Sequence, residues 1–371
     1  MDRLPTLRPR LPRADHILPY LRLIDNARTY SNHGPLVREL EQRLAERFGL
    51  EAADITTASS GTTAIIGAVL ATAGSAQKER PLAVIPAFSF VAAAVAVERC
   101  GYRPYLADVN AESWMLDPYA LLNCPLLDRV GIVIPVAPFG RPVPQEPWLA
   151  FQKETNIRII IDGGASFDTV LRDPSRYLGC LPVAFSFHAT KSFGTGEGGA
   201  VATSNTDLAQ RVVQALNFGF YGSRDSRSPS INGKMSEYHA AVGLAALDDW
   251  SATQEDYLVV ANAYHEIAGK CQIANSFFCA PDISMIYALF LCNSPDQTQR
   301  VMRNLDENEI DFRFWYGRGI QENTYYSFLN HNGLENSISI LPNLIGLPVA
   351  PDLAPADVER VITVVREGLS D

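Results

Sequence analysis

Residues 185–199 read FSFHATKSFGTGEGG and form the most informative stretch of the chain. A strand-like apolar run at 183–187 leads to Lys191, and a loop with four glycines follows the lysine. Glycine lets backbone and substrate approach closely, so an amine at Lys191 can reach a bound cofactor. An enzyme would present an amine in this way for Schiff-base chemistry. A lone lysine is usually a solvated surface group, but Ser186 at the strand end and the glycine loop favour the functional interpretation.

Strand-like runs alternate with longer segments of helical character on both sides of this stretch. Several of the runs are short and continuously apolar, as strands buried on both faces are. The alternation predicts an α/β fold with a mostly parallel, seven-stranded sheet covered by helices. The expected strands are 55–58, 82–86, 104–107, 131–136, 157–161, 183–187 and 200–203.

The chain divides into three predicted regions. Residues 1–25 are rich in proline and arginine and are expected to form an N-terminal arm, and residues 26–250 a large domain. The strand alternation fades near Trp250, so residues 251–371 are expected to form a smaller α+β domain. Helical spacing of apolar residues, with Pro35 at the start and Gly49 after the end, predicts a helix at 35–48. Further helices are expected at 251–270, 294–309 and 355–369.

Composition limits the classes of function. The 371 residues are 47% hydrophobic and carry a formal net charge of -10, which disfavours a nucleic-acid surface. No apolar run reaches the roughly 18 residues of a membrane span, and the N-terminus lacks a secretory apolar segment. The six cysteines form no CxxC pair and have no ligand spacing with the six histidines. We therefore expect reduced thiols, a cytoplasmic protein and no metal site.

Two candidate cofactor contacts follow the first two strands. Ser60, Gly61 and Thr62 precede an apolar helix, where free amides, hydroxyls and the helix N-terminus would hold a phosphate. The alternative is an ordinary helix cap. Phe90 follows the strand at 82–86 and could stack on a flat cofactor ring, with core packing as the alternative. The strand ends of an open α/β sheet are where such ligands bind.

Asp162 is the third candidate, directly after the apolar run at 157–161. A carboxylate there is costly without a partner, and a protonated pyridine nitrogen would be such a partner. The ion pair would keep the ring cationic and able to absorb electrons from a carbanion. A helix cap or a metal ligand is the alternative. Lys191 comes one βα unit later, which puts the two side chains on neighbouring strand ends.

These segments, taken in order, resemble a known enzyme family. The order comprises SGT at 60–62, an aromatic strand end at 86–90, IDGGA at 161–165 and the stretch around Lys191. Downstream, NGKMSE at 232–237 precedes AAVGL at 240–244, and upstream YSNHGPLV at 30–37 runs into Glu41. The set is similar to the DegT-type sugar aminotransferases, which are pyridoxal-phosphate enzymes of fold type I. The resemblance covers roughly residues 28–250 and the terminal helix.

The resemblance implies a role for each matching residue. Lys191 would form the Schiff base with pyridoxal 5′-phosphate, and Asp162 would pair with the pyridine nitrogen. Phe90 would stack on the ring, and His188 would line the site, although a packing role for His188 is equally open. Family members are homodimers with shared sites, so Asn232 would reach the phosphate of the neighbouring subunit. The implied phosphate contacts within the chain are Ser60, Gly61, Thr62 and Ser186.

Three positions depart from the family pattern, and one of them concerns the acceptor site. Lys234 stands where the family usually has arginine, and Ala165 where many members carry glutamine or histidine. The segment FRFWYGRG at 312–319 replaces a proline- and tyrosine-rich one that helps to shape the acceptor site. The residues expected to contact substrate are Asn32, Glu197, Arg313 and Trp315.

The expected activity is a ping-pong transamination from an amino acid, with glutamate as the expected donor, to a nucleotide-linked keto sugar. Its partners would be these small molecules and a second copy of the chain, with no nucleic acid and no membrane. One alternative keeps the cofactor but catalyses a lyase, decarboxylase or carbon–carbon bond-forming reaction. A second alternative is a non-catalytic regulatory protein of the same fold.

Overall fold

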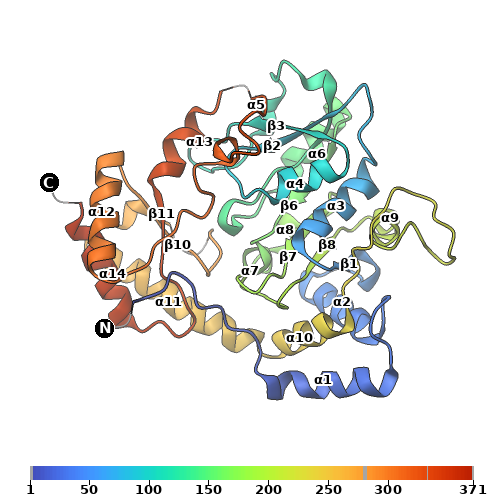
Figure 1. Cartoon of the computed structure of the whole chain (residues 1–371), viewed down its shortest axis with the longest axis horizontal. Helices are drawn as coiled ribbons and strands as arrows, with labels where there is room; N and C mark the ends of the chain where they lie inside the picture. Colours follow the sequence, from blue (N-terminus) through green and yellow to red (C-terminus); the bar gives the residue numbers. More distant parts are fainter. Residues whose placement is uncertain (1–2, 279–281, 332, 370–371) are drawn as a thin grey trace.

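The computed structural model describes residues 3–278, 282–331 and 333–369 (Figure 1). Figure 1 shows a large sheet with its helices on the right and a smaller C-terminal region on the left, with α10 (Glu237–Asp248) and α11 (Trp250–Lys270) below them. Cys279 lies outside the described residues, and the other five cysteines carry free thiols. No helix in the described ranges is both long enough and apolar enough to cross a lipid bilayer.

The large sheet has seven strands within the described residues, and six of them run parallel. Ile160 N donates to Val133 O (3.1 Å) and Asp162 N to Pro135 O (2.9 Å), which joins β5 and β6 into one strand beside β4. Only β8 runs antiparallel to its neighbours β1 and β7. The prediction of a mostly parallel α/β sheet is confirmed. The order across the sheet is β1 (Ile55–Ala58), β8 (Gly199–Ala202), β7 (Val183–Ser186), β6 (Ile161–Asp162) with β5 (Arg158–Ile159), β4 (Val130–Val133), β2 (Leu82–Pro86) and β3 (Arg103–Ala107).

Helices cover both faces of this sheet, because strand side chains alternate between two hydrophobic cores. On β2, Leu82 and Val84 pack in one core, and Ala83 and Ile85 in the other. The second core contains buried residues of α3 (Gly61–Thr72), α4 (Ala92–Arg99) and α9 (Thr206–Leu216). The first contains buried residues of α2 (Pro35–Phe48), α6 (Gln145–Thr155), α10 and α11.

Shorter helical pieces connect these elements. The short α-helices are α5 (Pro118–Leu121), α7 (Phe167–Val170) and α8 (Pro174–Tyr177). The 3-10 turns are Ala52–Asp54, Leu127–Arg129, Pro138–Gly140, Ala274–Ser276, Ile320–Glu322 and Leu341–Asn343.

The C-terminal region is built on a second, antiparallel sheet with the order β11 (Leu344–Leu347), β10 (Ala288–Leu291) and β9 (Phe277–Phe278). Its helices are α12 (Pro295–Glu307), α13 (Glu335–Ile340) and α14 (Pro355–Glu367), and α14 packs on both α11 and α12.

The N-terminal residues lie against this region and against the large domain. Leu4 pairs with Ile310 and Leu7 with Val349 in parallel bridges. Next, α1 (Ala14–Ala27) packs on α10. The division into an arm at 1–25, a large domain at 26–250 and a small domain at 251–371 stays a prediction, and the boundary at residue 25 falls inside α1.

Candidate active site

A cavity of about 650 Å³ opens at the carboxyl ends of the parallel strands. The strand-end residues Asp162 and Ser186 line it from the sheet, and residues 313–316 line it from the C-terminal region. This is the edge at which open α/β sheets bind their ligands. The cavity brings together most of the predicted site residues, namely Ser60, Gly61, Thr62, Phe90, Asp162, Ser186, His188, Lys191, Glu197, Arg313 and Trp315.

The N-terminus of α3 forms one end of the cavity. Ser60 caps this helix by accepting a hydrogen bond from Thr63 N (3.1 Å), and Thr63 Oγ1 accepts one from Ser60 N (2.8 Å). Since the first amides of a helix have no intrahelical acceptor, the N–H groups of Gly61 and Thr62 remain available to an anion. A Cβ at Gly61 would lie 2.6 Å from Ser186 Cβ, so only glycine lets the two segments meet here. The result is a polar cradle whose free amides suit a phosphate.

The Asp162 carboxylate is buried at the end of β6. Within the described residues, Asp162 Oδ1 accepts one hydrogen bond, from Gly164 N at 2.9 Å. Burial raises the pKa of Asp162, while the Gly164 bond and the nearby Lys191 charge act in the opposite direction. A buried carboxylate with so few donors favours a cationic partner. The protonated ring nitrogen of pyridoxal phosphate fits that requirement.

Lys191 lies on the turn that follows β7. Its backbone N–H donates to His188 O (2.9 Å), and Thr195 N donates to Phe187 O (2.8 Å), which folds the turn back on itself. Among the residues that the structure describes, the Lys191 amine has no hydrogen-bond or ion-pair partner. An unpaired amine that lines the same cavity as the Asp162 carboxylate is available to react with a bound carbonyl compound.

The glycines after Lys191 have different surroundings. Gly196 has φ 86°, which few other residues adopt. A Cβ at Gly199 would lie 2.7 Å from both Phe185 O and Ser60 O, because three strand ends converge there. The sequence analysis interpreted the loop glycines as allowing the close approach of substrate. At Gly199 the close approach is instead between strand ends of the protein itself.

A buried carboxylate that the sequence analysis missed supports the residue next to Lys191. Asp168 on α7 is fully buried and accepts hydrogen bonds from Ser192 Oγ (2.8 Å), Ser284 Oγ (2.7 Å) and Met285 N (3.0 Å). One side chain thus joins the lysine turn to the segment that leads into β10.

The C-terminal wall of the cavity is largely aromatic. The Arg313 guanidinium lies 5.1 Å from the centre of the Trp315 ring. Tyr316 stacks on Phe139 at 4.4 Å, and its hydroxyl accepts a hydrogen bond from Phe139 N (2.9 Å). Burial raises the pKa of Tyr316 well above its ordinary value, so this residue stays a neutral donor. Tyr316 and Tyr287 were missed as site residues, and only the unusual 312–319 segment gave a signal for Tyr316.

Three predicted residues lie at more open positions in the cavity. His188 Nδ1 lies 2.8 Å from Thr190 Oγ1, and His188 Nε2 lies 3.7 Å from Glu197 Oε1. The Phe90 side chain is 60% exposed although it lines the cavity, so it presents a free aromatic face to a ligand.

Asn232 and Asn32 are the two predicted residues that do not line this cavity. Both are exposed, and Asn232 Oδ1 accepts a hydrogen bond from Lys234 Nζ (2.7 Å). Lys234 also lies over the Phe218 ring at 4.4 Å. A role for Asn232 in the site of a neighbouring subunit stays a prediction. The described residues contain no cluster of side chains that could hold a metal ion.

The chain is similar in sequence to an aminotransferase family and to proteins named as sugar transaminases. The DegT/DnrJ/EryC1/StrS aminotransferase family model matches residues 13–366. The chain is 29% identical to Protein Mb3436c of Mycobacterium bovis, over 99% of this chain and 90% of that protein. It is 26% identical to dTDP-4-amino-4,6-dideoxy-D-glucose transaminase of Shigella dysenteriae, over 97% of each.

Solved structures give the same result. The structure of DesI with its TDP-sugar product superposes with a TM-score of 0.86 at 26% identity, over 100% of this chain and 94% of that one. A PLP-dependent aminotransferase fold from Bacillus cereus superposes with a TM-score of 0.90 at 23% identity, over 98% of this chain and 100% of that one. From the family match and the geometry of the cavity, we conclude that the chain belongs to the DegT/DnrJ/EryC1/StrS aminotransferase family and that its cofactor is pyridoxal 5′-phosphate (PLP).

Proposed function

We propose that this enzyme transfers an amino group from glutamate to a nucleotide-linked keto sugar by a ping-pong reaction, with Lys191 as the Schiff-base lysine. The observation that carries the proposal is the Asp162 carboxylate and the unpaired Lys191 amine in one cavity, with the cradle of α3 at its end. An amine, an acidic partner for a ring nitrogen and a phosphate cradle are the three contacts that a PLP transaminase requires.

Each of these contacts has a defined part in holding the cofactor. The amides of Gly61 and Thr62, together with the Ser186 hydroxyl, would bind the phosphate at the positive end of α3. Asp162 would keep the ring nitrogen protonated. When bound, PLP supplies an electron sink for the carbanion formed at the donor's α-carbon. Phe90 would cover one face of the ring.

Lys191 would do the proton transfer. As a free amine, Lys191 Nζ would lie beside the reacting carbons of the bound substrates. It can take a proton from the α-carbon of glutamate and, in the second half-reaction, return a proton to the sugar carbon that receives the amine. The neutral Tyr316 hydroxyl and the apolar C-terminal wall would limit the access of water.

The acceptor class rests on relatives and on the C-terminal wall. The Shigella dysenteriae relative is named as a transaminase of a dTDP-linked amino sugar, and the DesI structure was obtained with a TDP-sugar product. In the present chain, Arg313 and Trp315 offer a guanidinium and an aromatic ring to such a ligand. These groups suit the diphosphate and the base of a nucleotide sugar.

We also propose a homodimer in which Asn232 acts in the partner's cavity. Asn232 is exposed and lies outside the cavity of its own chain. Large aromatic side chains are exposed near it, with Phe218 at 46% and Tyr221 at 45%. Exposed aromatic side chains of this kind are enriched in protein interfaces.

The half-reaction tests the proposed activity. Holoenzyme mixed with glutamate alone should form pyridoxamine phosphate and at most one 2-oxoglutarate per subunit. A panel of nucleotide-linked keto sugars, added next, should yield an amino sugar and regenerate PLP. Release of carbon dioxide from amino acids, or no pyridoxamine phosphate with any common amino donor, would instead favour another PLP reaction.

A further inference from the structure

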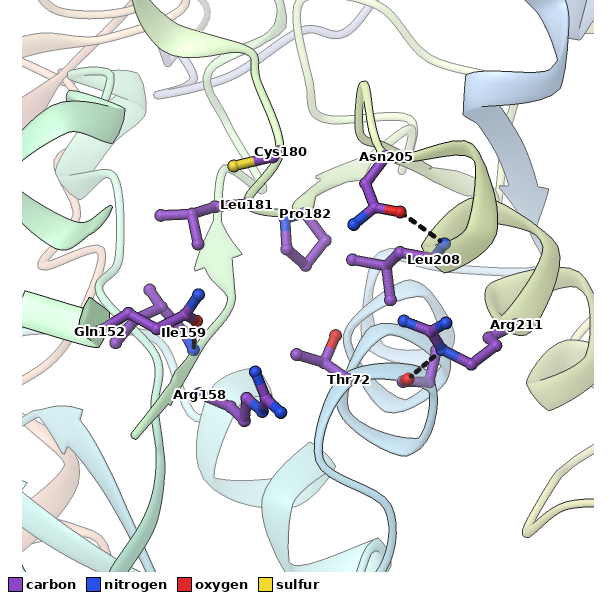
Figure 2. A pocket seen from close by; sticks show the side chains of 11 residues that line it. Thr72, Gln152, Arg158, Ile159, Cys180, Leu181, Pro182, Asn205, Leu208 and Arg211 are labelled. Atoms are coloured by element: carbon purple, nitrogen blue, oxygen red, sulfur yellow. Dashed lines mark hydrogen bonds between the residues drawn. The ribbon is translucent and has the colours of Figure 1, made fainter. Parts of the chain in front are cut away.

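A second pocket, of about 330 Å³, lies at the opposite edge of the large sheet from the active-site cavity (Figure 2). Arg158 is the first residue of β5, and Pro182 directly precedes β7. The pocket therefore sits at the amino ends of the strands whose carboxyl ends carry Asp162 and Ser186. The four residues of β7 separate the two openings by roughly 13 Å.

Two arginines give this pocket its charge. The Arg211 Nε donates to Ala71 O (3.1 Å), which holds the guanidinium beside the end of α3 and leaves its two terminal nitrogens available. The Arg158 side chain has no hydrogen-bond or ion-pair partner within the described ranges. Figure 2 shows both guanidinium groups at the pocket, with Thr72 between them. Two guanidiniums held at one pocket form a site for an oxyanion.

The neutral polar groups of the pocket are donors as well. Gln152 Oε1 accepts a hydrogen bond from Ile159 N (3.2 Å), and Asn205 Oδ1 accepts one from Leu208 N (3.0 Å). Because both amide oxygens are in use, the NH₂ groups of these side chains remain to donate. The Thr72 hydroxyl is buried and has no hydrogen-bond partner among the residues that the structure describes.

No carboxylate lines this pocket in the described chain, although the whole chain has a net charge of -10. Its free polar groups are thus two cations, two amide donors and a hydroxyl. Such a set favours an anion and disfavours a cation or an apolar ligand. We propose that the pocket is a second ligand site, separate from the catalytic centre, that binds a small oxyanion such as the phosphate group of a metabolite.

The exposed thiol of Cys180 lies in the same pocket and provides a local probe. Holoenzyme is suitable because PLP then fills the cradle of α3. It would be treated with a limiting amount of iodoacetamide in inorganic phosphate, in succinate, or in potassium chloride of equal ionic strength. Peptide mapping then gives the extent of modification of Cys180, with Cys124 as the internal reference. Protection by phosphate beyond that of chloride is expected, and the succinate arm tells whether a dicarboxylate serves as well.

Matched variants make the test specific. Arg158→Ala should weaken the protection by phosphate about tenfold or more, since a guanidinium supplies charge-assisted hydrogen bonds. Arg103 is also an exposed arginine at the amino end of a strand, β3, but it lies outside the pocket. Arg103→Ala should therefore leave the protection by phosphate unchanged. Equal protection by phosphate and chloride, or full protection in Arg158→Ala, would overturn the proposal.

Discussion

Two aspartates that are close in sequence have different environments. Asp162 accepts one recorded hydrogen bond and lines the cavity, while Asp168 is fully buried with three donors from two distant segments. The first is suited to pairing with a ligand, and the second to fixing the protein around Lys191. The difference follows from the number of protein donors around each carboxylate.

Asp168→Ala should destabilise the protein strongly. The change leaves Ser192 Oγ, Ser284 Oγ and Met285 N without their acceptor in a buried place, at a cost on the order of 3 kcal/mol. Urea unfolding of the variant and of wild type measures this difference. Asp173→Ala, an exposed change in the same segment, is the control and should cost little. An unchanged midpoint in Asp168→Ala would show that this network does not hold the lysine turn.

Glu41 should make stability depend on pH. It accepts hydrogen bonds from Thr57 N (2.8 Å) and Oγ1 (2.9 Å), and burial raises its pKa to about 7. In the unfolded chain the pKa of Glu41 is near 4.5. Between about pH 4.5 and about pH 7, Glu41 is therefore protonated in the folded state but ionised in the unfolded chain. The free energy of unfolding therefore falls as pH rises from about 4.5 to about 7.

Glu41→Gln removes this titration and should reduce the loss of stability between about pH 5 and about pH 8 by up to roughly 3 kcal/mol. Urea unfolding at the two pH values measures it. Glu39→Gln, on the exposed side of the same helix, should leave the pH dependence as in wild type. Identical pH profiles for Glu41→Gln and wild type would contradict this assignment.

Site residues were predictable where the signal is local. Asp162 directly follows the mostly apolar run 157–161, and Lys191 comes shortly after the run 183–187, so the strand ends that carry them can be identified in the sequence. Asp168 could not be identified, because its partner Ser284 is 116 residues away along the chain. Tyr287 could not be identified either, since only the packing of the C-terminal region brings it to the cavity.

At the scale of elements, the N-terminus of α3 is the most sensitive part of the site. Gly61→Ala would place a Cβ 2.6 Å from Ser186 Cβ and push apart the two walls of the phosphate cradle. We expect PLP affinity to fall by about tenfold or more, as measured by fluorescence titration of apoenzyme. Gly269→Ala is a matched change in α11, where a Cβ meets no described atom within 4 Å, and it should leave the affinity unchanged. Equal affinities for both variants would argue against the cradle.

Element boundaries were predictable where residue chemistry marks them. The predicted helix at 35–48 matches α2, because Pro35 fits the first turn and Gly49 adopts φ 65° after the last. The predicted strand at 131–136 is longer than β4, which ends at Val133. Pro135 lacks an N–H and so cannot continue the regular ladder, although its carbonyl still accepts from Asp162 N.

At the scale of the whole molecule, the proposed shared sites predict complementation. Lys191→Ala and Asn232→Ala subunits should each be inactive alone. In mixed dimers one of the two sites would contain both wild-type residues. Random mixing should then restore about a quarter of wild-type activity per subunit, since half of the dimers are hybrids.

The two variants would be co-expressed with different affinity tags and purified as one-to-one mixtures. The transaminase activity of these mixtures per subunit is then compared with that of wild type. A mixture of Lys191→Ala with Asp162→Ala subunits is the control and should stay inactive, because both residues lie in one chain's cavity. No recovery in the first mixture would mean that Asn232 does not act across an interface.

The large sheet and its ligand edge were predictable because strands and helices alternate regularly up to residue 250. In the C-terminal wall, Arg313 and Trp315 were predicted, but the small sheet behind them was not, because its strands are short and β10 pairs with β11 across a long sequence separation. Their order depends on packing with α11, α12 and α14, which no local pattern reveals.

Borohydride reduction of the holoenzyme tests whether Lys191 carries PLP in this cavity. Reduction fixes the cofactor to its lysine, and peptide mass mapping then identifies that residue. We predict that the added mass is on the peptide that contains Lys191 and that Lys191→Ala lacks both this adduct and the visible absorption band. An adduct on another lysine, or a visible band that persists in Lys191→Ala, would contradict the account.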